Sequence, residues 1–325
     1  MTRLIQTLFA PTVIFALASS PAWSNPSRWV HEWPNTDFTI HSVDLAEIRN
    51  GGPPKDGIPA IDDPAFVSVA DENGLHEREP VMTVEIADQV PRAYPVRYLI
   101  WHEIVNDIIG DTPVAVTFCP LCNSGLIFDR RLGNEQLSFG VSGKLRKSDM
   151  VMYDRETESW WQQFEGVAIV GEMTGAVLDQ VPGWVESWLD FRTRNPGGLV
   201  MIQPSHRRPY GANPYVGYDS SFSPFLYSGE NPPHDIPPLS RVVVVGDRAW
   251  PLTRVREAGE IIEDGVRIKW KEGTASALDT NAIAEGRDVG SIRVRDAATG
   301  ADIPHDVAFA FAFHAFTPEG RWMIE

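Results

Sequence analysis

The sequence predicts a mainly β protein with minor helices, an α+β chain in which two related β-rich halves form one compact unit. Three observations support this prediction. Short apolar or alternating runs bounded by Gly, Pro or Asp recur along the chain, which is typical of strands. Gly and Pro, at 26 residues each, indicate many turns between short elements. A short motif near residue 92 also recurs near residue 248.

The first 24 residues are predicted to be a secretory signal peptide. Arg3 precedes the apolar stretch 8–18, which is too short to span a bilayer, and the tripeptide Ala-Trp-Ser at 22–24 resembles a small-residue cleavage site. Cleavage there would leave a periplasmic or secreted chain beginning at Asn25. An uncleaved membrane anchor is the alternative. No later segment reaches the roughly 18 apolar residues of a transmembrane helix, so no membrane span is expected after signal removal.

The charge of the chain limits its partners. The formal net charge is −16 at pH 7, and removal of the signal would take away Arg3 but no acid. Such a chain repels phosphate backbones and anionic lipid headgroups. We therefore expect no nucleic-acid partner.

The mature chain divides into four predicted regions. Residues 25–80 form an N-terminal segment, 81–200 a first β-rich repeat with a CxxC site, 201–240 a Pro-rich linker or lid, and 241–325 a second β-rich repeat with a C-terminal strand. Strands are expected at 81–86, 114–118, 126–128, 242–245 and 266–270, and helices at 96–106 and 184–194. The Pro-rich region contains eight prolines between residues 203 and 238, and either joins the repeats or folds over the site.

The repeat rests on two pairs of motifs. Arg92-Ala-Tyr-Pro-Val recurs as Arg248-Ala-Trp-Pro-Leu, each after a β-rich run and before a helical stretch, and Asp154-Arg-Glu-Thr is echoed by Asp296-Ala-Ala-Thr. Chance similarity in a Pro-rich chain is the alternative. If the repeat is real, the shared motif is structural. His102 and the cysteines, which the second copy lacks, are then additions to the first copy.

Cys119 and Cys122 are the only cysteines, in the sequence Thr-Phe-Cys-Pro-Leu-Cys-Asn, and three interpretations compete. A disulfide staple would close a very short loop and stabilise the chain by only about 2 kcal/mol. A redox pair would form and break a disulfide through a low-pKa thiolate. A metal knuckle would supply half of a tetrahedral site, and a turn between two strands favours such a knuckle. Haem attachment is excluded because residue 123 is Asn rather than His.

Two histidines are candidates to assist the cysteines. His102 follows a helical stretch upstream, and His314 lies in an alternating apolar strand, where a buried imidazole needs a specific partner. In the redox hypothesis Cys119 attacks, Cys122 resolves, and His314 or His102 lowers a thiol pKa or moves a proton. In the metal hypothesis Cys119, Cys122, His102 and His314 hold zinc or copper. A core histidine bonded to backbone is the alternative for either.

Several motifs together resemble the domain-of-unknown-function family 3179. They are Asp56–Asp62, Ala93–Pro95, His102–Asp107, Thr117–Cys122 and Met152–Thr157, in this order, and the resemblance extends from Asp56 to Phe313-His314. The resemblance implies no activity. Some members of the family are described as selenoproteins with selenocysteine in the CxxC region, which implies redox chemistry.

These observations lead to one principal hypothesis and two alternatives. The principal one is an exported dithiol protein, a possible thiol oxidoreductase with thiol–disulfide or peroxide-type chemistry, an unknown redox or protein partner and no certain cofactor. The first alternative is a zinc- or copper-binding protein with a Cys2His2-type site. The second is a protein-interaction module in which the dithiol is incidental.

Overall fold

The computed structural model describes residues 26–325, so the predicted signal peptide lies outside the described residues. The protein is mainly β, with 36% strand and 14% helix, as the sequence predicts. All five predicted strands are present, with ends that shift by a few residues. No helix among the described residues is long and apolar enough to cross a membrane.

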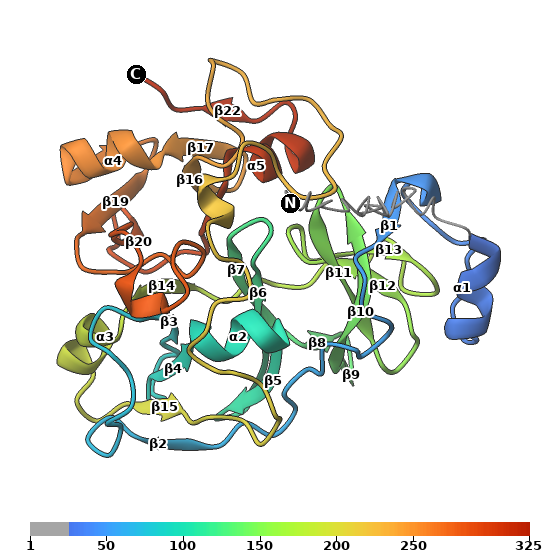
Figure 1. Ribbon diagram of the computed structural model, residues 1–325, viewed down its shortest axis with the longest axis horizontal. Helices are drawn as coiled ribbons and strands as arrows, with labels where there is room; N and C mark the ends of the chain where they lie inside the picture. Colours follow the sequence, from blue (N-terminus) through green and yellow to red (C-terminus); the bar gives the residue numbers. More distant parts are fainter. Residues whose placement is uncertain (1–25) are drawn as a thin grey trace, which may run out of the picture.

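The five α-helices are short, and the strands form six sheets (Figure 1). The helices are α1 (Pro26–Glu32), α2 (Val96–His102), α3 (Trp188–Arg194), α4 (Leu252–Ala258) and α5 (Ala310–Phe316), and the 3-10 turns span Leu45–Glu47, Tyr218–Ser220 and Ile283–Glu285. One five-stranded sheet has the order β1 (Ile48–Asn50), β10 (Phe139–Arg146), β11 (Asp149–Asp154), β12 (Trp160–Gln162) and β13 (Val167–Val170). The other has the order β14 (Gly183–Ser187), β3 (Pro80–Val84), β4 (Arg92–Pro95), β15 (Leu199–Met201) and β2 (Phe66–Ser68).

The remaining sheets are smaller. A four-stranded sheet has the order β21 (Asp306–Phe309), β16 (Arg241–Val245), β17 (Arg248–Pro251) and β22 (Arg321–Trp322). One three-stranded sheet contains β5 (Ile104–Ile109), β6 (Thr112–Cys119) and β7 (Ser124–Asp129). The other contains β18 (Glu260–Glu263), β19 (Val266–Lys271) and β20 (Ser291–Asp296). A hairpin pairs β8 (Arg131–Leu132) with β9 (Glu135–Gln136).

The five larger sheets are arranged as five blades of a β-propeller. Strand β14 contacts β20 and β7, and β10 contacts β5. An apolar cluster that includes Trp250 and Ile268 joins the β18–β20 sheet to the β16–β17 sheet. Phe316 of α5 stacks on Phe164 and so connects the β16–β17 side to the β10–β13 sheet. The β5–β7 sheet, which carries the cysteines, lies in the middle of Figure 1.

Two units of the chain share one topology. In the first unit, β14 pairs antiparallel with β3 of the β3–β4 hairpin, and β15 pairs parallel with β4. In the second unit, β21 pairs antiparallel with β16 of the β16–β17 hairpin, and β22 pairs parallel with β17. Arg92 and Arg248 begin the equivalent strands β4 and β17, and a seven-residue helix follows each. The division into two halves is not confirmed, since the β10–β13 sheet has no counterpart, and the duplication stays a prediction.

The second pair of motifs does not mark equivalent positions. Asp154 ends β11, whereas Asp296 ends β20, which corresponds to β7 rather than to β11. Each aspartate accepts hydrogen bonds from the backbone and hydroxyl of the threonine three residues later. Their similarity therefore reflects the same local turn.

Three predicted elements differ in the structure. Helix α2 ends at His102 because Glu103 takes a left-handed conformation, so the helix predicted to residue 106 is too long. Residues 183–187 form β14, and α3 begins only after Ser187, whose side chain caps it. The predicted C-terminal strand around His314 is wrong, since these residues form α5. Its first four residues are all buried, and an apolar run buried on every side has no period that separates helix from strand.

Candidate functional site

The cysteines occupy the turn of the β6–β7 hairpin. Cys119 pairs with Ser124 across the two strands, and the turn closes through Asn123, whose backbone is left-handed at φ 51° and whose N–H donates to Pro120 O. Asn tolerates this conformation better than most residues. The cysteine pair therefore lies in a turn between two strands, as the sequence predicts. Both thiols are free and buried, and the two side chains approach to 4.0 Å.

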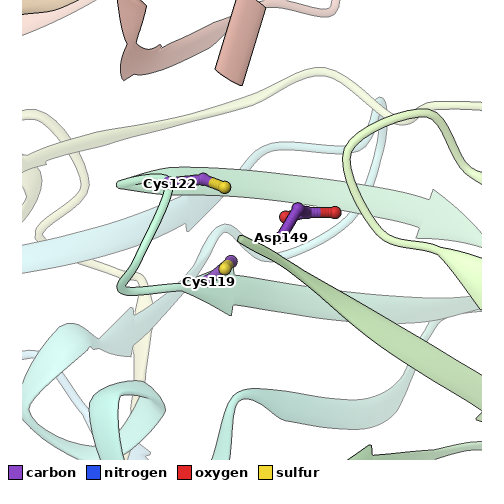
Figure 2. A group of neighbouring side chains, drawn as sticks. All are labelled: Cys119, Cys122 and Asp149. Atoms are coloured by element: carbon purple, nitrogen blue, oxygen red, sulfur yellow. The ribbon is translucent and has the colours of Figure 1, made fainter. Parts of the chain in front are cut away.

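A second hairpin brings Asp149 to the two sulfurs. Lys147 and Ser148 join β10 to β11 with φ of 51° and 66°, the pattern of a tight hairpin turn. Asp149 then begins β11 beside the cysteine turn (Figure 2). One carboxylate oxygen of Asp149 and the two sulfurs lie within 4.8 Å of one another, and all three residues are buried. The Cys122 thiol also donates to Ser148 O at 3.5 Å.

Only one oxygen of the Asp149 carboxylate is satisfied. Its Oδ2 accepts from Gln162 Nε2 at 2.6 Å and from Phe164 N at 3.0 Å. Its Oδ1 is buried and has no hydrogen-bond partner among the described residues. Because buried polar atoms are nearly always paired, an unpaired carboxylate oxygen beside two sulfurs suggests that the site accepts a further group.

The electrostatics of the site favour neutral groups. Burial raises the pKa of the Cys119 and Cys122 thiols, and the charge of Asp149 adds to this effect. Burial also raises the pKa of Asp149 to about 6 and, together with the charge of Asp149, that of Glu103 to about 8. Within residues 26–325 neither carboxylate forms an ion pair. The site therefore collects acidic groups and lacks the cation that would stabilise their charged forms.

The cysteine turn is fixed from its other side by β21. Phe309 N donates to Cys122 O at 2.8 Å, and Asn123 Nδ2 donates to Val307 O at 2.6 Å. The Asp306 carboxylate accepts from Gly125 N at 3.0 Å, and burial raises its pKa to about 7. These bonds leave the turn little freedom to move.

The predicted histidines make other contacts. His102 is fully buried, and its ring nitrogens bond to Pro59 O at 2.7 Å and to the Tyr210 hydroxyl at 2.5 Å. Burial lowers its pKa. His314 lies on α5 near Trp322, and its buried Nδ1 has no partner among the described residues. Neither imidazole belongs to the group of neighbouring ligand atoms formed by Cys119, Cys122 and Asp149, and the roles assigned to the histidines stay predictions.

The Pro-rich segment packs over the site. Tyr218 donates from its hydroxyl to Leu121 O, between the two cysteines, at 3.1 Å. The same hydroxyl accepts from Phe225 N at 3.1 Å, and Ser148 donates to Phe225 O. The segment thus contacts both hairpins of the site, which fits a cover better than a free linker.

A cleft lies between this segment and the hairpins. Its walls are mainly apolar, with one carboxyl from Glu103, and are formed by Gly51, Pro53, Ile58, Glu103, Leu121, Val141, Gly143, Lys144, Leu145, Met150, Tyr215, Tyr218 and Phe225. Leu121 separates the cysteines in the chain, and Met150 follows Asp149. The cleft therefore reaches residues adjoining every member of the Cys2Asp group.

The sequence does not predict three residues of this site: Asp149, Glu103 and Tyr218. Asp149 and Tyr218 come from segments distant in sequence, and no spacing rule connects them with the cysteines. Glu103 offered one signal, because it aligns with Gly259 after the repeated motif.

The comparisons with known proteins give a family and no activity. A family model described as "Protein of unknown function (DUF3179)" matches residues 55–320, most of the chain, which confirms the resemblance seen in the sequence. No curated protein and no solved structure matches the chain.

Proposed function

The chain belongs to this DUF3179 family of proteins of unknown function, and we propose that it binds a transition-metal ion through Cys119, Cys122 and Asp149. The proposal rests on one observation: three ligand atoms of suitable chemistry lie within 4.8 Å of one another, all in buried residues. Thiolate and carboxylate are both common zinc ligands. The unpaired Asp149 Oδ1 supports it, since an ion would supply the missing partner.

The distance between the cysteine side chains fits an ion better than a disulfide. A disulfide bond joins sulfurs at about 2.05 Å. Two thiolates that bind one zinc ion at about 2.3 Å with a tetrahedral angle lie about 3.8 Å apart. The observed approach of 4.0 Å is almost twice the first value and close to the second, which two reduced thiols in van der Waals contact would also give.

The charges of the site also support a bound cation. Burial disfavours the ionised forms of both thiols and of Asp149, and no cationic side chain among the described residues pairs with that carboxylate. A divalent cation would reverse this balance, because a coordinating thiol is deprotonated outright.

Zinc suits this ligand set better than copper. Cu(I) selects soft sulfur ligands, whereas zinc accepts mixed sulfur and oxygen ligands. Three protein ligands leave one position of a tetrahedral ion open, which is the arrangement of catalytic rather than structural zinc sites.

The direct test is metal analysis of the full-length protein, purified without a metal-affinity step, together with a count of free thiols. We expect about one equivalent of zinc, as the single Cys2Asp group implies, and thiols that become reactive after chelation. Copper instead of zinc would correct the choice of ion. No bound metal, together with no uptake of added zinc, would overturn the proposal.

A dithiol redox function is the second candidate, and one observation favours it. The Asp149 carboxylate, with a pKa of about 6, lies beside both thiols and can accept a proton from either. With a peroxide as oxidant, Cys119 would take one oxygen to form a sulfenic acid and release an alcohol or water. Cys122 would then displace water and form the disulfide. The raised thiol pKa values and the buried sulfurs count against this function. A metal-free protein with a reversible disulfide would support it.

We also propose that the protein is exported. The support is the sequence of residues 1–24, with a charged start, a short apolar stretch and a small-residue site. Expression in a Gram-negative host should give a periplasmic chain whose intact mass begins at Asn25. A mass that retains residues 1–24 would contradict this prediction.

A further inference from the structure

Glu103 adopts an unusual backbone conformation at the end of α2. Its φ is 61°, and its N–H donates to Leu99 O as the last turn of the helix closes. The equivalent residue after α4 is Gly259, with φ 71° and the same bond to Val255 O. Glycine takes this conformation without strain, while a Glu there is rare. The first unit therefore has Glu103 at a position whose backbone conformation favours Gly, the residue found in the second unit.

The side chain of Glu103 has no structural role that explains its retention. The residue is 8% exposed, and its carboxyl forms no hydrogen bond or ion pair with the residues that the structure describes. Neither oxygen of the carboxyl is fully buried, because Glu103 lines the cleft. A residue with a strained backbone whose carboxyl has no hydrogen-bond partner in the described part of the chain is a candidate for function.

The position of Glu103 relates it to the Cys2Asp group. Its carbonyl accepts from Phe118 N at 2.8 Å, so it lies across the β5–β6 pair beside Cys119. The carboxyl faces the apolar cleft with Leu121 and Met150, which adjoin the cysteines and Asp149. The charge of Asp149 contributes to the raised pKa of Glu103, although the Glu103 carboxyl lies outside the group of ligand atoms that are within 4.8 Å of one another.

We propose that Glu103 supports the metal site from the side that opens to the cleft, where its carboxyl, which lies outside the Cys2Asp group, holds the water bound at the open position of the ion. The inference rests on the metal site proposed above. The cleft is the route by which water or a small uncharged molecule reaches this side, since its walls are mainly apolar and Lys144 is paired with Glu32. Glu103 is therefore a binding residue retained at the expense of backbone strain.

The test compares two variants of Glu103 with a matched control in the full-length protein. Glu103→Gln keeps the size of the side chain and removes its ability to ionise, and Glu103→Gly also relieves the backbone. Asp88 has the same φ of 61° and is exposed in the turn before β4, so Asp88→Gly relieves backbone strain away from the site. Zinc affinity is measured by competition with a chelator, and the thermal midpoint is measured on metal-free protein.

We expect both Glu103 variants to bind zinc about 10- to 100-fold more weakly, as for groups that support a metal centre. Metal-free Glu103→Gly should melt at a higher temperature than wild type, and by more than Asp88→Gly, because it also removes a largely buried carboxyl. Asp88→Gly should bind zinc as wild type does. Zinc affinity of both Glu103 variants within twofold of wild type would overturn the role of Glu103 alone. Failure of wild type to bind zinc would overturn the metal site and this inference together.

Discussion

Asp149→Asn is expected to lower zinc affinity by at least about 100-fold, more than the loss of a supporting group would. The substitution keeps an oxygen for the hydrogen bonds from Gln162 and Phe164 but removes the negative charge of a ligand. Cys119→Ser and Cys122→Ser should have effects at least as large, because a hydroxyl does not ionise in their place. Affinity is measured by competition with a chromophoric chelator.

Asp190→Asn is the matched control for this prediction. Asp190 is also buried and also has an unpaired carboxylate oxygen, but it lies on α3 and pairs with Lys271. It should alter stability without altering zinc binding. Zinc affinity of Asp149→Asn within threefold of wild type would remove Asp149 from the ligand set. Equal losses in Asp149→Asn and Asp190→Asn would indicate a general loss of folding.

The local parts of the site could be predicted from sequence because they depend on neighbouring residues. The strands on either side of Cys119 and Cys122 follow from β-rich runs, and the turn between them follows from the strands. Asp149 could not be predicted, because a separate hairpin brings it to the sulfurs by a tertiary contact. The sequence instead suggested two histidines as ligands. In the fold, His102 bonds to Pro59 O and to the Tyr210 hydroxyl, and His314 lies on α5.

The limits of the fold prediction have the same origin. The shared motif at Arg92 and Arg248 identified equivalent strands because each is followed at once by a helix of the same length. The Asp154 and Asp296 motifs matched only because both encode one turn, and a turn carries no information on the sheet to which it belongs. Alternation around His314 suggested a strand, although burial of the first four residues of α5 removes the polar face that would reveal its period.

Gly143→Ala is expected to destabilise the protein by about 3 kcal/mol or more, since it combines a disfavoured conformation with a backbone collision. Gly143 lies in β10, where the pairing with β11 shifts register, and has φ 72°. A Cβ on residue 143 would collide with Pro53 O. The Gly143 carbonyl also accepts a hydrogen bond from Gly51 N at 2.8 Å. The collision involves backbone, so relief requires a shift of β10, the strand that leads to Asp149.

Gly133→Ala separates the two contributions. Gly133 has φ 60° in the exposed β8–β9 turn, and a Cβ there meets no atom within 4 Å. It should lose only about 1 kcal/mol, from the left-handed conformation alone. Urea denaturation of the metal-free variants measures both free energies of unfolding. If β10 positions Asp149 as the structure indicates, Gly143→Ala should also weaken zinc binding while Gly133→Ala leaves it unchanged. Equal destabilisation by the two substitutions would show that β10 adapts to the added methyl group, and the rigid placement of Asp149 would then be wrong.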